Sequence, residues 1–80
     1  LYKVACGPNG DDYNWTKVIT KNITPWHTNA VSLHYYTVPK GQWEDKGNAT
    51  GFTDEEYYIT LEKTWYMETL VKRHCDILNV

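Results

Sequence analysis

Alternation of apolar and polar positions predicts two short β-strands in this chain. The clearer strand covers residues 30–36, Ala-Val-Ser-Leu-His-Tyr-Tyr. Side chains alternate across a strand, so this segment has one apolar face, made of Val31, Leu33 and Tyr35. Its other face bears hydrogen-bonding groups, those of Ser32, His34 and Tyr36. The other strand, residues 2–6, stops at the dense turn signal Gly-Pro-Asn-Gly.

A short amphipathic helix is predicted after the first strand. Asp11 or Asp12 is placed to cap it, because an aspartate accepts hydrogen bonds from the free N–H groups of a first turn. One face has the helical spacing i, i+3, i+4 and i+7, with the apolar Trp15, Val18 and Ile19 followed by Asn22, near which the helix is expected to end. Thr24-Pro25 then closes it, since a residue before proline avoids the helical region.

The last helix has the clearest start signal in the chain. Thr53 and Glu56 form a capping box, and Phe52 and Tyr57 occupy the positions of a hydrophobic staple. We predict one helix over residues 54–78. One apolar stripe consists of Tyr57, Leu61, Val71, Cys75 and Leu78, and a second of Ile59, Tyr66, Leu70 and Ile77. A helix with two apolar stripes is expected to pack against more than one neighbour.

The order β-α-β-α with short spacing is typical of a parallel sheet. Two parallel strands with helices cannot cover their own edges and faces, so we expect these residues to be a segment of a larger α/β fold. The connection over residues 37–52 is long for a loop and contains Trp43, which is typical of a functional loop. In a closed α/β barrel the polar face of residues 30–36 would point inward, toward the strand ends at which barrel active sites lie.

Composition narrows the class of protein. A chain of 80 residues is one domain at most, and 8 Lys and Arg against 10 Asp and Glu argue against a nucleic-acid partner, which requires a clustered basic face. No apolar run approaches the roughly 18 residues of a membrane span, and we expect no signal peptide or membrane partner. Cys6 and Cys75 lie in apolar contexts and are expected to be buried, reduced thiols. Without Cys-x-x-Cys or a close histidine pair, no metal or other cofactor is expected.

Several motifs together give the chain a family resemblance. Ala-Cys-Gly-Pro-Asn at residues 5–9, with Asp-Asp-Tyr-Asn-Trp-Thr at residues 11–16, resembles the segment after the fourth barrel strand in the α-L-arabinofuranosidases of glycoside hydrolase family 51. Ser-Leu-His-Tyr-Tyr-Thr at residues 32–37 resembles their sixth strand. The loop and helix that follow are similar at Gly47-Asn48-Ala49-Thr50, Phe52, Glu55-Glu56 and Met67-Glu68. The resemblance spans nearly the whole chain in order.

The resemblance implies a β-α-β-α segment of a (β/α)8 TIM barrel, about strands 5 and 6 with their helices. Residues 1–80 are then part of a catalytic domain, with no complete domain boundary inside the chain. The implied activity is release of terminal α-L-arabinofuranosyl residues from arabinose-containing hemicellulose and oligosaccharides, with retention of configuration.

Retention requires two carboxyl groups about 5–5.5 Å apart. The family has its acid/base Glu after an Asn at the end of strand four and its nucleophile in Glu-Trp-Gly at the end of strand seven. This sequence contains neither Asn-Glu nor Glu-Trp-Gly, so no catalytic residue is assigned and the chain alone is expected to be inactive.

The resemblance assigns substrate-binding roles instead. His34 and Tyr36 match positions that line the subsite for the arabinosyl ring, with Tyr36 close to the nucleophile. A phenol O–H donated to that carboxylate would orient it and stabilise its charge. Trp43 is assigned as a third substrate-binding residue, with a loop anchor as the alternative. Asn9 is a weaker candidate and is interpreted first as a turn residue.

Other interpretations stay open at this stage. One is a small aromatic-rich carbohydrate- or protein-binding module without catalysis, since aromatic residues make up 15% of the chain. Another is a different barrel hydrolase with the same use of its sixth strand. The Asn-x-Thr triplets at Asn14, Asn22 and Asn48 are interpreted as incidental, and free thiols favour a cytoplasmic location over secretion. A homo-oligomeric parent is one alternative for the assembly.

Overall fold

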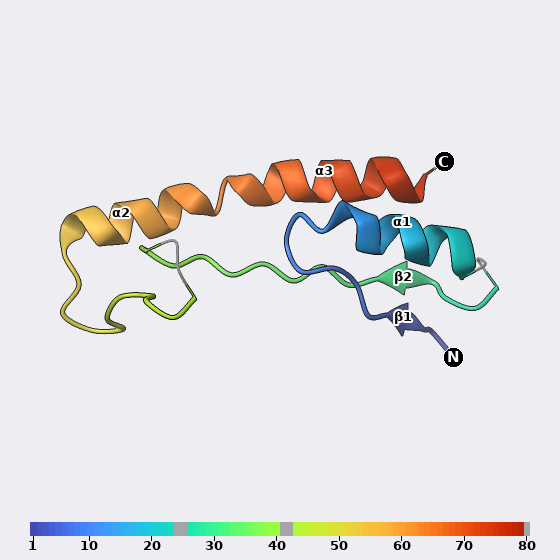
Figure 1. Ribbon diagram of the computed structural model, residues 1–80, viewed down its shortest axis with the longest axis horizontal. Helices are drawn as coiled ribbons and strands as arrows, with labels where there is room; N and C mark the ends of the chain where they lie inside the picture. Colours follow the sequence, from blue (N-terminus) through green and yellow to red (C-terminus); the bar gives the residue numbers. More distant parts are fainter. Residues whose placement is uncertain (24–25, 41–42, 80) are drawn as a thin grey trace.

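The computed structural model describes residues 1–23, 26–40 and 43–79. The elements in chain order are β1 (Val4–Ala5), α1 (Tyr13–Asn22), β2 (Ala30–Val31), α2 (Asp54–Lys63) and α3 (Tyr66–Leu78). The shape is elongated, 48 × 22 × 21 Å, with α2 and α3 running end to end along its length (Figure 1). Both strands and α1 lie at the end of the molecule that holds α3. No helix among the described residues is both long and apolar enough to cross a membrane.

The two strands are parallel, as the element order predicts. Val4 pairs with Ala30 and Ala5 with Val31, and the pairing then resumes at a single bridge between Asn9 and His34. Both strands are therefore shorter than predicted from the apolar pattern. The ladder between them is interrupted at residues 7–8, where the Gly7 N–H donates to the Ser32 hydroxyl instead of a backbone carbonyl and Pro8 has no N–H to donate, so β2 stops at Val31.

Helix α1 begins and ends where the sequence predicts. Asp12 is the N-cap, and its carboxylate accepts a hydrogen bond from the Trp15 N–H at 3.1 Å. The predicted terminator Thr24-Pro25 lies outside the described residues. The expected apolar stripe faces outward, with Trp15 and Val18 about half exposed, because α1 packs against α3 through the buried Thr16 instead.

The prediction of one helix over residues 54–78 is wrong, since the helix is interrupted between Lys63 and Tyr66. The backbone N–H of Thr64 donates to the carbonyl of Leu61, three residues back, and Trp65 does the same to Glu62. The Lys63 carbonyl, which a continuous helix would offer to the Met67 N–H, accepts the Tyr35 hydroxyl at 2.8 Å. A tertiary contact from the segment after β2 therefore takes over one helical hydrogen bond at the break.

The start of α2 is confirmed in detail. The Glu56 N–H donates to the Thr53 hydroxyl at 3.1 Å, and the Thr53 N–H donates to the Glu56 carboxylate at 3.2 Å. The rings of Phe52 and Tyr57 are stacked, with centroids 6.3 Å apart. This closed cap fixes the point at which the long loop after β2 enters α2.

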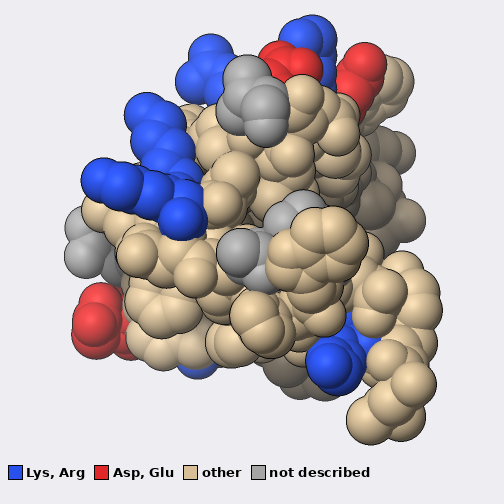
Figure 2. Space-filling model, turned by 90° about the vertical axis from the view of Figure 1, so that its right-hand side faces the viewer, with Lys and Arg blue, Asp and Glu red and all other residues tan. Residues whose placement is uncertain are grey.

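The buried core is small. It consists of Leu70, Thr16 and His74, and Gly7 and Pro8 are also buried. Of the two predicted stripes on residues 54–78, Leu70 is buried, whereas Tyr57, Leu61 and Val71 are exposed. The end at which the strands begin presents a largely uncharged centre, with charged side chains of both signs around its margin (Figure 2). Many other large apolar side chains are also exposed. Such exposure is typical of a surface that packs against further structure.

Both cysteines are free, as predicted, but the expectation of burial is wrong. Cys6 and Cys75 are exposed. Cys75 lines an apolar hollow between α3 and the segment after β2, together with Val71 and Leu33. The apolar sequence around Cys75 thus correctly indicates apolar neighbours. It does not indicate that the thiol is buried.

Candidate functional site

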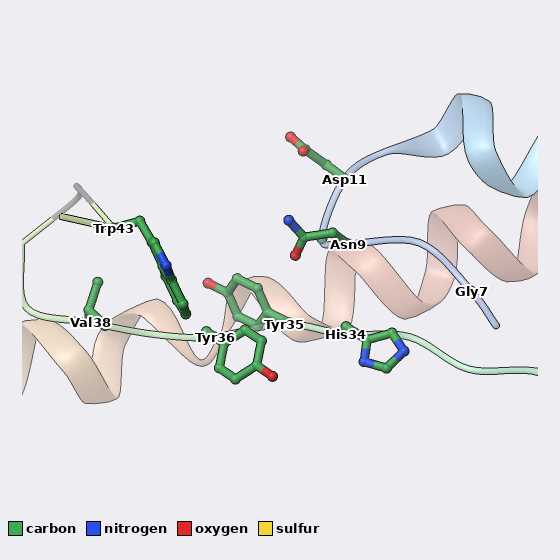
Figure 3. Close-up of a pocket in the computed structure, with 9 residues that line it drawn as sticks. Gly7, Asn9, Asp11, His34, Tyr35, Tyr36, Val38 and Trp43 are labelled. Carbon is green, nitrogen blue, oxygen red and sulfur yellow. The ribbon is translucent and has the colours of Figure 1, made fainter. Parts of the chain in front are cut away.

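A cavity of about 700 Å³ lies at the carboxyl ends of the two strands (Figure 3). Its lining comes from the loop after β1 and from the chain after β2, and consists of Gly7, Asn9, Gly10, Asp11, His34, Tyr35, Tyr36, Val38 and Trp43. The carboxyl ends of parallel strands are where α/β proteins bind their ligands. The three residues that the sequence assigns to substrate binding, His34, Tyr36 and Trp43, all line this cavity.

After β2 successive side chains continue to point to alternate sides of the chain, as far as the residues that line the cavity. In Figure 3 the rings of His34 and Tyr36 lie on one side of the chain and the ring of Tyr35 on the other. Ser32 shares the side of His34, since its hydroxyl lies 3.1 Å from His34 Nε2. Tyr35 reaches the opposite way and binds the Lys63 carbonyl at the helix break. The polar face predicted from the sequence is thus formed.

The loop after β2 brings Trp43 back to the end of this polar face. The rings of Tyr36 and Trp43 are in edge contact, with centroids 5.6 Å apart and planes at 67°. Lys46 places its ammonium nitrogen 3.9 Å from the centroid of the Trp43 ring, a cation–π contact. Tyr36 and Trp43 remain more than half exposed, so their apolar surfaces are open to the cavity.

The loop after β1 is held tightly against the chain after β2. The Gly10 N–H donates to the His34 carbonyl at 2.6 Å, and the His34 N–H donates to the Pro8 carbonyl at 3.1 Å. A Cβ atom on Gly7 would lie 1.5 Å from the Ser32 carbonyl oxygen, so only glycine permits this approach. Asn9 consequently stands beside His34 at the strand ends.

A buried histidine that sequence reasoning missed supports the loop from behind. His74 on α3 lies 2.8 Å from the Gly10 carbonyl through Nε2 and 2.7 Å from the Thr16 hydroxyl through Nδ1. A carbonyl only accepts, so a ring with its hydrogen on Nε2 satisfies both contacts. The ring of Tyr13 lies 4.8 Å away and covers one side. The only sequence signal was a polar residue beside the apolar stripe of the last helix.

Asp11 is a second lining residue that sequence reasoning left unassigned. Asp12 performs the capping for which both aspartates were candidates, and the Asp11 side chain points to the cavity (Figure 3). Its Oδ2 lies 3.5 Å from the Tyr66 hydroxyl. The Tyr13 hydroxyl next to Tyr66, followed by burial and the Asp11 charge, raises the pKa of Tyr66 above its usual value. That Tyr13 hydroxyl is buried and falls outside hydrogen-bond geometry with any described residue.

The lining combines aromatic faces with an amide, an imidazole and a carboxylate, a mixture suited to a hydroxyl-rich ligand such as a sugar. Among the described residues, no cluster of three or more His, Cys, Asp or Glu side chains is arranged to hold a metal ion. Parallel strands, helices and a cavity at the carboxyl ends of the strands are typical of part of an α/β domain.

Comparison with known proteins finds arabinofuranosidases that are similar to this chain. The chain is 39% identical over 79 residues to the intracellular exo-alpha-L-arabinofuranosidase of Bacteroides ovatus, a match that covers 99% of this chain and 15% of that protein. The crystal structure of the GH51 arabinofuranosidase from Xanthomonas axonopodis pv. citri superposes with a TM-score of 0.85 at 35% identity, covering 98% of this chain and 15% of that one. No family profile matches the chain.

These matches confirm the resemblance found in the sequence: the chain is homologous to a segment of GH51 arabinofuranosidases. It spans about 15% of the length of each relative. Its helices and small parallel sheet fit the TIM-barrel domain of such an enzyme.

Proposed function

We propose that this chain is part of the catalytic (β/α)8 barrel of a retaining glycoside hydrolase, one that releases terminal α-L-arabinofuranosyl residues from arabinose-containing hemicellulose and oligosaccharides. In this proposal β1 and β2 are the fifth and sixth barrel strands, and residues 1–80 lie within one catalytic domain. The observation that carries it is the cavity at the carboxyl ends of two parallel strands, lined by His34, Tyr36 and Trp43, in a chain homologous throughout to arabinofuranosidases.

The lining residues have distinct roles in the proposal. Tyr36 donates its phenol O–H to the nucleophilic carboxylate, which another part of the parent protein supplies, and so orients it. His34, held by the Ser32 hydroxyl, binds hydroxyl groups of the arabinosyl ring. Trp43 offers its indole to an apolar sugar face, and its contacts with Tyr36 and Lys46 hold it over the strand ends. The chain binds and orients, and the parent contributes both reacting carboxylates.

The parent protein is proposed to act on carbohydrate in the cytoplasm. The relative from Bacteroides ovatus is named intracellular, and both cysteines of this chain are free. A homo-oligomer is one option for its assembly.

The direct test uses the full-length parent. Purified protein should release the aryl group from 4-nitrophenyl α-L-arabinofuranoside, and the first sugar product seen by NMR should have the α configuration of the substrate. An inverted product would contradict the retaining mechanism. No turnover of any arabinofuranoside by a folded parent would contradict the proposed activity.

A further inference from the structure

We propose that Lys63 is a positioning residue for Tyr36, which it holds at the cavity from the break between α2 and α3. This inference rests on the proposed function and deepens it, because it names what fixes the phenol that orients the nucleophile. Lys63 itself is not among the described residues that line the cavity. Its contacts reach the chain on either side of Tyr36, at Tyr35 and at Val38.

The strand pairing ends before it reaches Tyr36. The N–H and the carbonyl of His34 are both hydrogen-bonded to the loop after β1. In the part of the chain that the structure describes, no backbone–backbone hydrogen bond continues this ladder at residues 35–40. Tyr36 is 68% exposed, and its ring contact with Trp43 comes from the loop that follows. Neither the sheet nor burial therefore fixes Tyr36, so other contacts must set its position.

Lys63 supplies two such contacts, one from its backbone and one from its side chain. Its carbonyl accepts the Tyr35 hydroxyl at 2.8 Å, and its ammonium nitrogen donates to the Val38 carbonyl at 2.7 Å. Both contacts are partly buried, and a charged donor makes a stronger hydrogen bond than a neutral one. Among the described residues the ammonium group of Lys63 takes part in no ion pair. One residue thus holds the chain just before and just after Tyr36.

The anchored Tyr35 ring also determines the side to which Tyr36 points. The ring of Tyr35 is in edge contact with that of Tyr66 at the start of α3, with centroids 5.9 Å apart and planes at 68°. Successive side chains of an extended chain point to opposite sides, and the rings of Tyr35 and Tyr36 do so in Figure 3. Fixing Tyr35 on the helices therefore directs Tyr36 away from them.

The test is steady-state kinetics of the full-length parent on 4-nitrophenyl α-L-arabinofuranoside. Lys63→Met keeps the aliphatic stem and removes the ammonium donor. We expect kcat/KM to fall by about fivefold to tenfold, chiefly in kcat, because a displaced Tyr36 leaves the other sugar-binding groups in place. Lys63→Arg retains a charged donor and should recover part of the loss.

A double-mutant cycle separates positioning from a merely structural role. Because Lys63 acts through the Tyr36 hydroxyl, Lys63→Met should cost less than about twofold in a Tyr36→Phe background, where that hydroxyl is already gone. Lys72→Met is the matched control, since it removes an exposed ammonium group that pairs with Asp76 on α3. Its kcat/KM should stay within about twofold of wild type, because exposed ion pairs contribute little.

Wild-type kcat/KM in a folded Lys63→Met variant would overturn the inference, as would equal losses in the wild-type and Tyr36→Phe backgrounds. If Lys63→Met does not fold, Tyr35→Phe carries the same cycle, because it removes the other contact with Lys63 and keeps the ring. A wild-type parent that turns over no arabinofuranoside would remove the proposed function itself, and this inference with it. An active wild type with either of the first two outcomes would remove the positioning role alone.

Discussion

His74 Nε2 on α3 donates a hydrogen bond to the Gly10 carbonyl on the loop after β1, at 2.8 Å and 64 residues away in the chain. The same ring lies 2.7 Å from the buried Thr16 hydroxyl of α1. One side chain thus joins two helices to the loop that carries Asn9 and Asp11. Because Gly10 also donates to the His34 carbonyl, the position of α3 is coupled to the floor of the cavity.

Replacing His74 is expected to destabilise the parent protein. His74→Leu leaves the buried Thr16 hydroxyl without a partner, at a cost of about 1–3 kcal/mol, and the partly buried Gly10 carbonyl without its partner, at a smaller cost. His74→Gln, whose amide offers one donor and one acceptor, should recover part of the loss. Denaturant unfolding of the two variants gives the comparison. Equal stability of His74→Leu and wild type would show that these contacts contribute nothing to folding.

The approach of the loop to the chain after β2 should tolerate only glycine at position 7. In Gly7→Ala the new methyl group would lie 1.5 Å from the Ser32 carbonyl oxygen, so the two segments must separate. We expect a loss of about 3 kcal/mol or failure to fold, at the upper end of typical overpacking costs.

Gly10→Ala is the matched control for this substitution. Apart from its own chain neighbours, no described residue has an atom within 4 Å of the added Cβ, so the strain of φ +52° is the main cost. Its cost should be about 1–2 kcal/mol. A Gly10→Ala variant less stable than Gly7→Ala, measured by the same thermal unfolding assay, would contradict the close approach seen at Gly7.

The capping box at α2 should contribute to stability locally. Thr53→Ala removes the acceptor of the Glu56 N–H and should cost about 1 kcal/mol, whereas Thr53→Ser should cost only a few tenths. Chemical denaturation of the parent measures both. Identical midpoints for the alanine and serine variants would show that the hydroxyl at this position has no capping role.

Residues 1–80 expressed alone should associate or unfold readily. Trp26 and Trp65 are 84% and 77% exposed, and the outer edges of both strands are unpaired in the described sheet. Sedimentation velocity and urea unfolding would report the state of the isolated segment. A monomer with a sharp cooperative transition would contradict the expectation that these surfaces need further structure.

Local signals in the sequence correctly predicted the features that are determined by residues close together in the chain. The capping box at Thr53, the end of α1 near Asn22 and the face shared by Ser32, His34 and Tyr36 all follow from spacing alone. The parallel pairing of β1 and β2 followed from the element order. These features need no information about distant segments.

Features that depend on distant contacts were missed. At the break after Lys63 the carbonyl of that residue accepts the hydroxyl of Tyr35, 28 residues earlier, and the Met67 N–H donates to the Thr64 carbonyl instead. Thr16, and not the apolar stripe of α1, faces α3, because its hydroxyl meets His74 across 58 residues. The sequence likewise does not indicate which of the two adjacent aspartates caps α1 and which lines the cavity. Such choices are made by tertiary packing, which spacing along one chain does not encode.

The central claim is that the polar face after β2 lines the active site of the parent enzyme. His34→Ala should weaken turnover partly through lost ring binding, and so with a rise in KM. Steady-state kinetics on an aryl α-L-arabinofuranoside, with folding checked in parallel, separates this effect from loss of structure. An unchanged KM and kcat in His34→Ala would remove that residue from the site.

Tyr36→Phe gives the most direct measurement, because it deletes one hydroxyl and leaves the ring in contact with Trp43. Loss of one hydrogen bond to a charged carboxylate should lower kcat/KM of the full-length parent by about tenfold to 150-fold, with little change in unfolding temperature. A folded Tyr36→Phe variant with wild-type kcat/KM would contradict the account, since the residue at the end of the polar face would then have no part in the reaction.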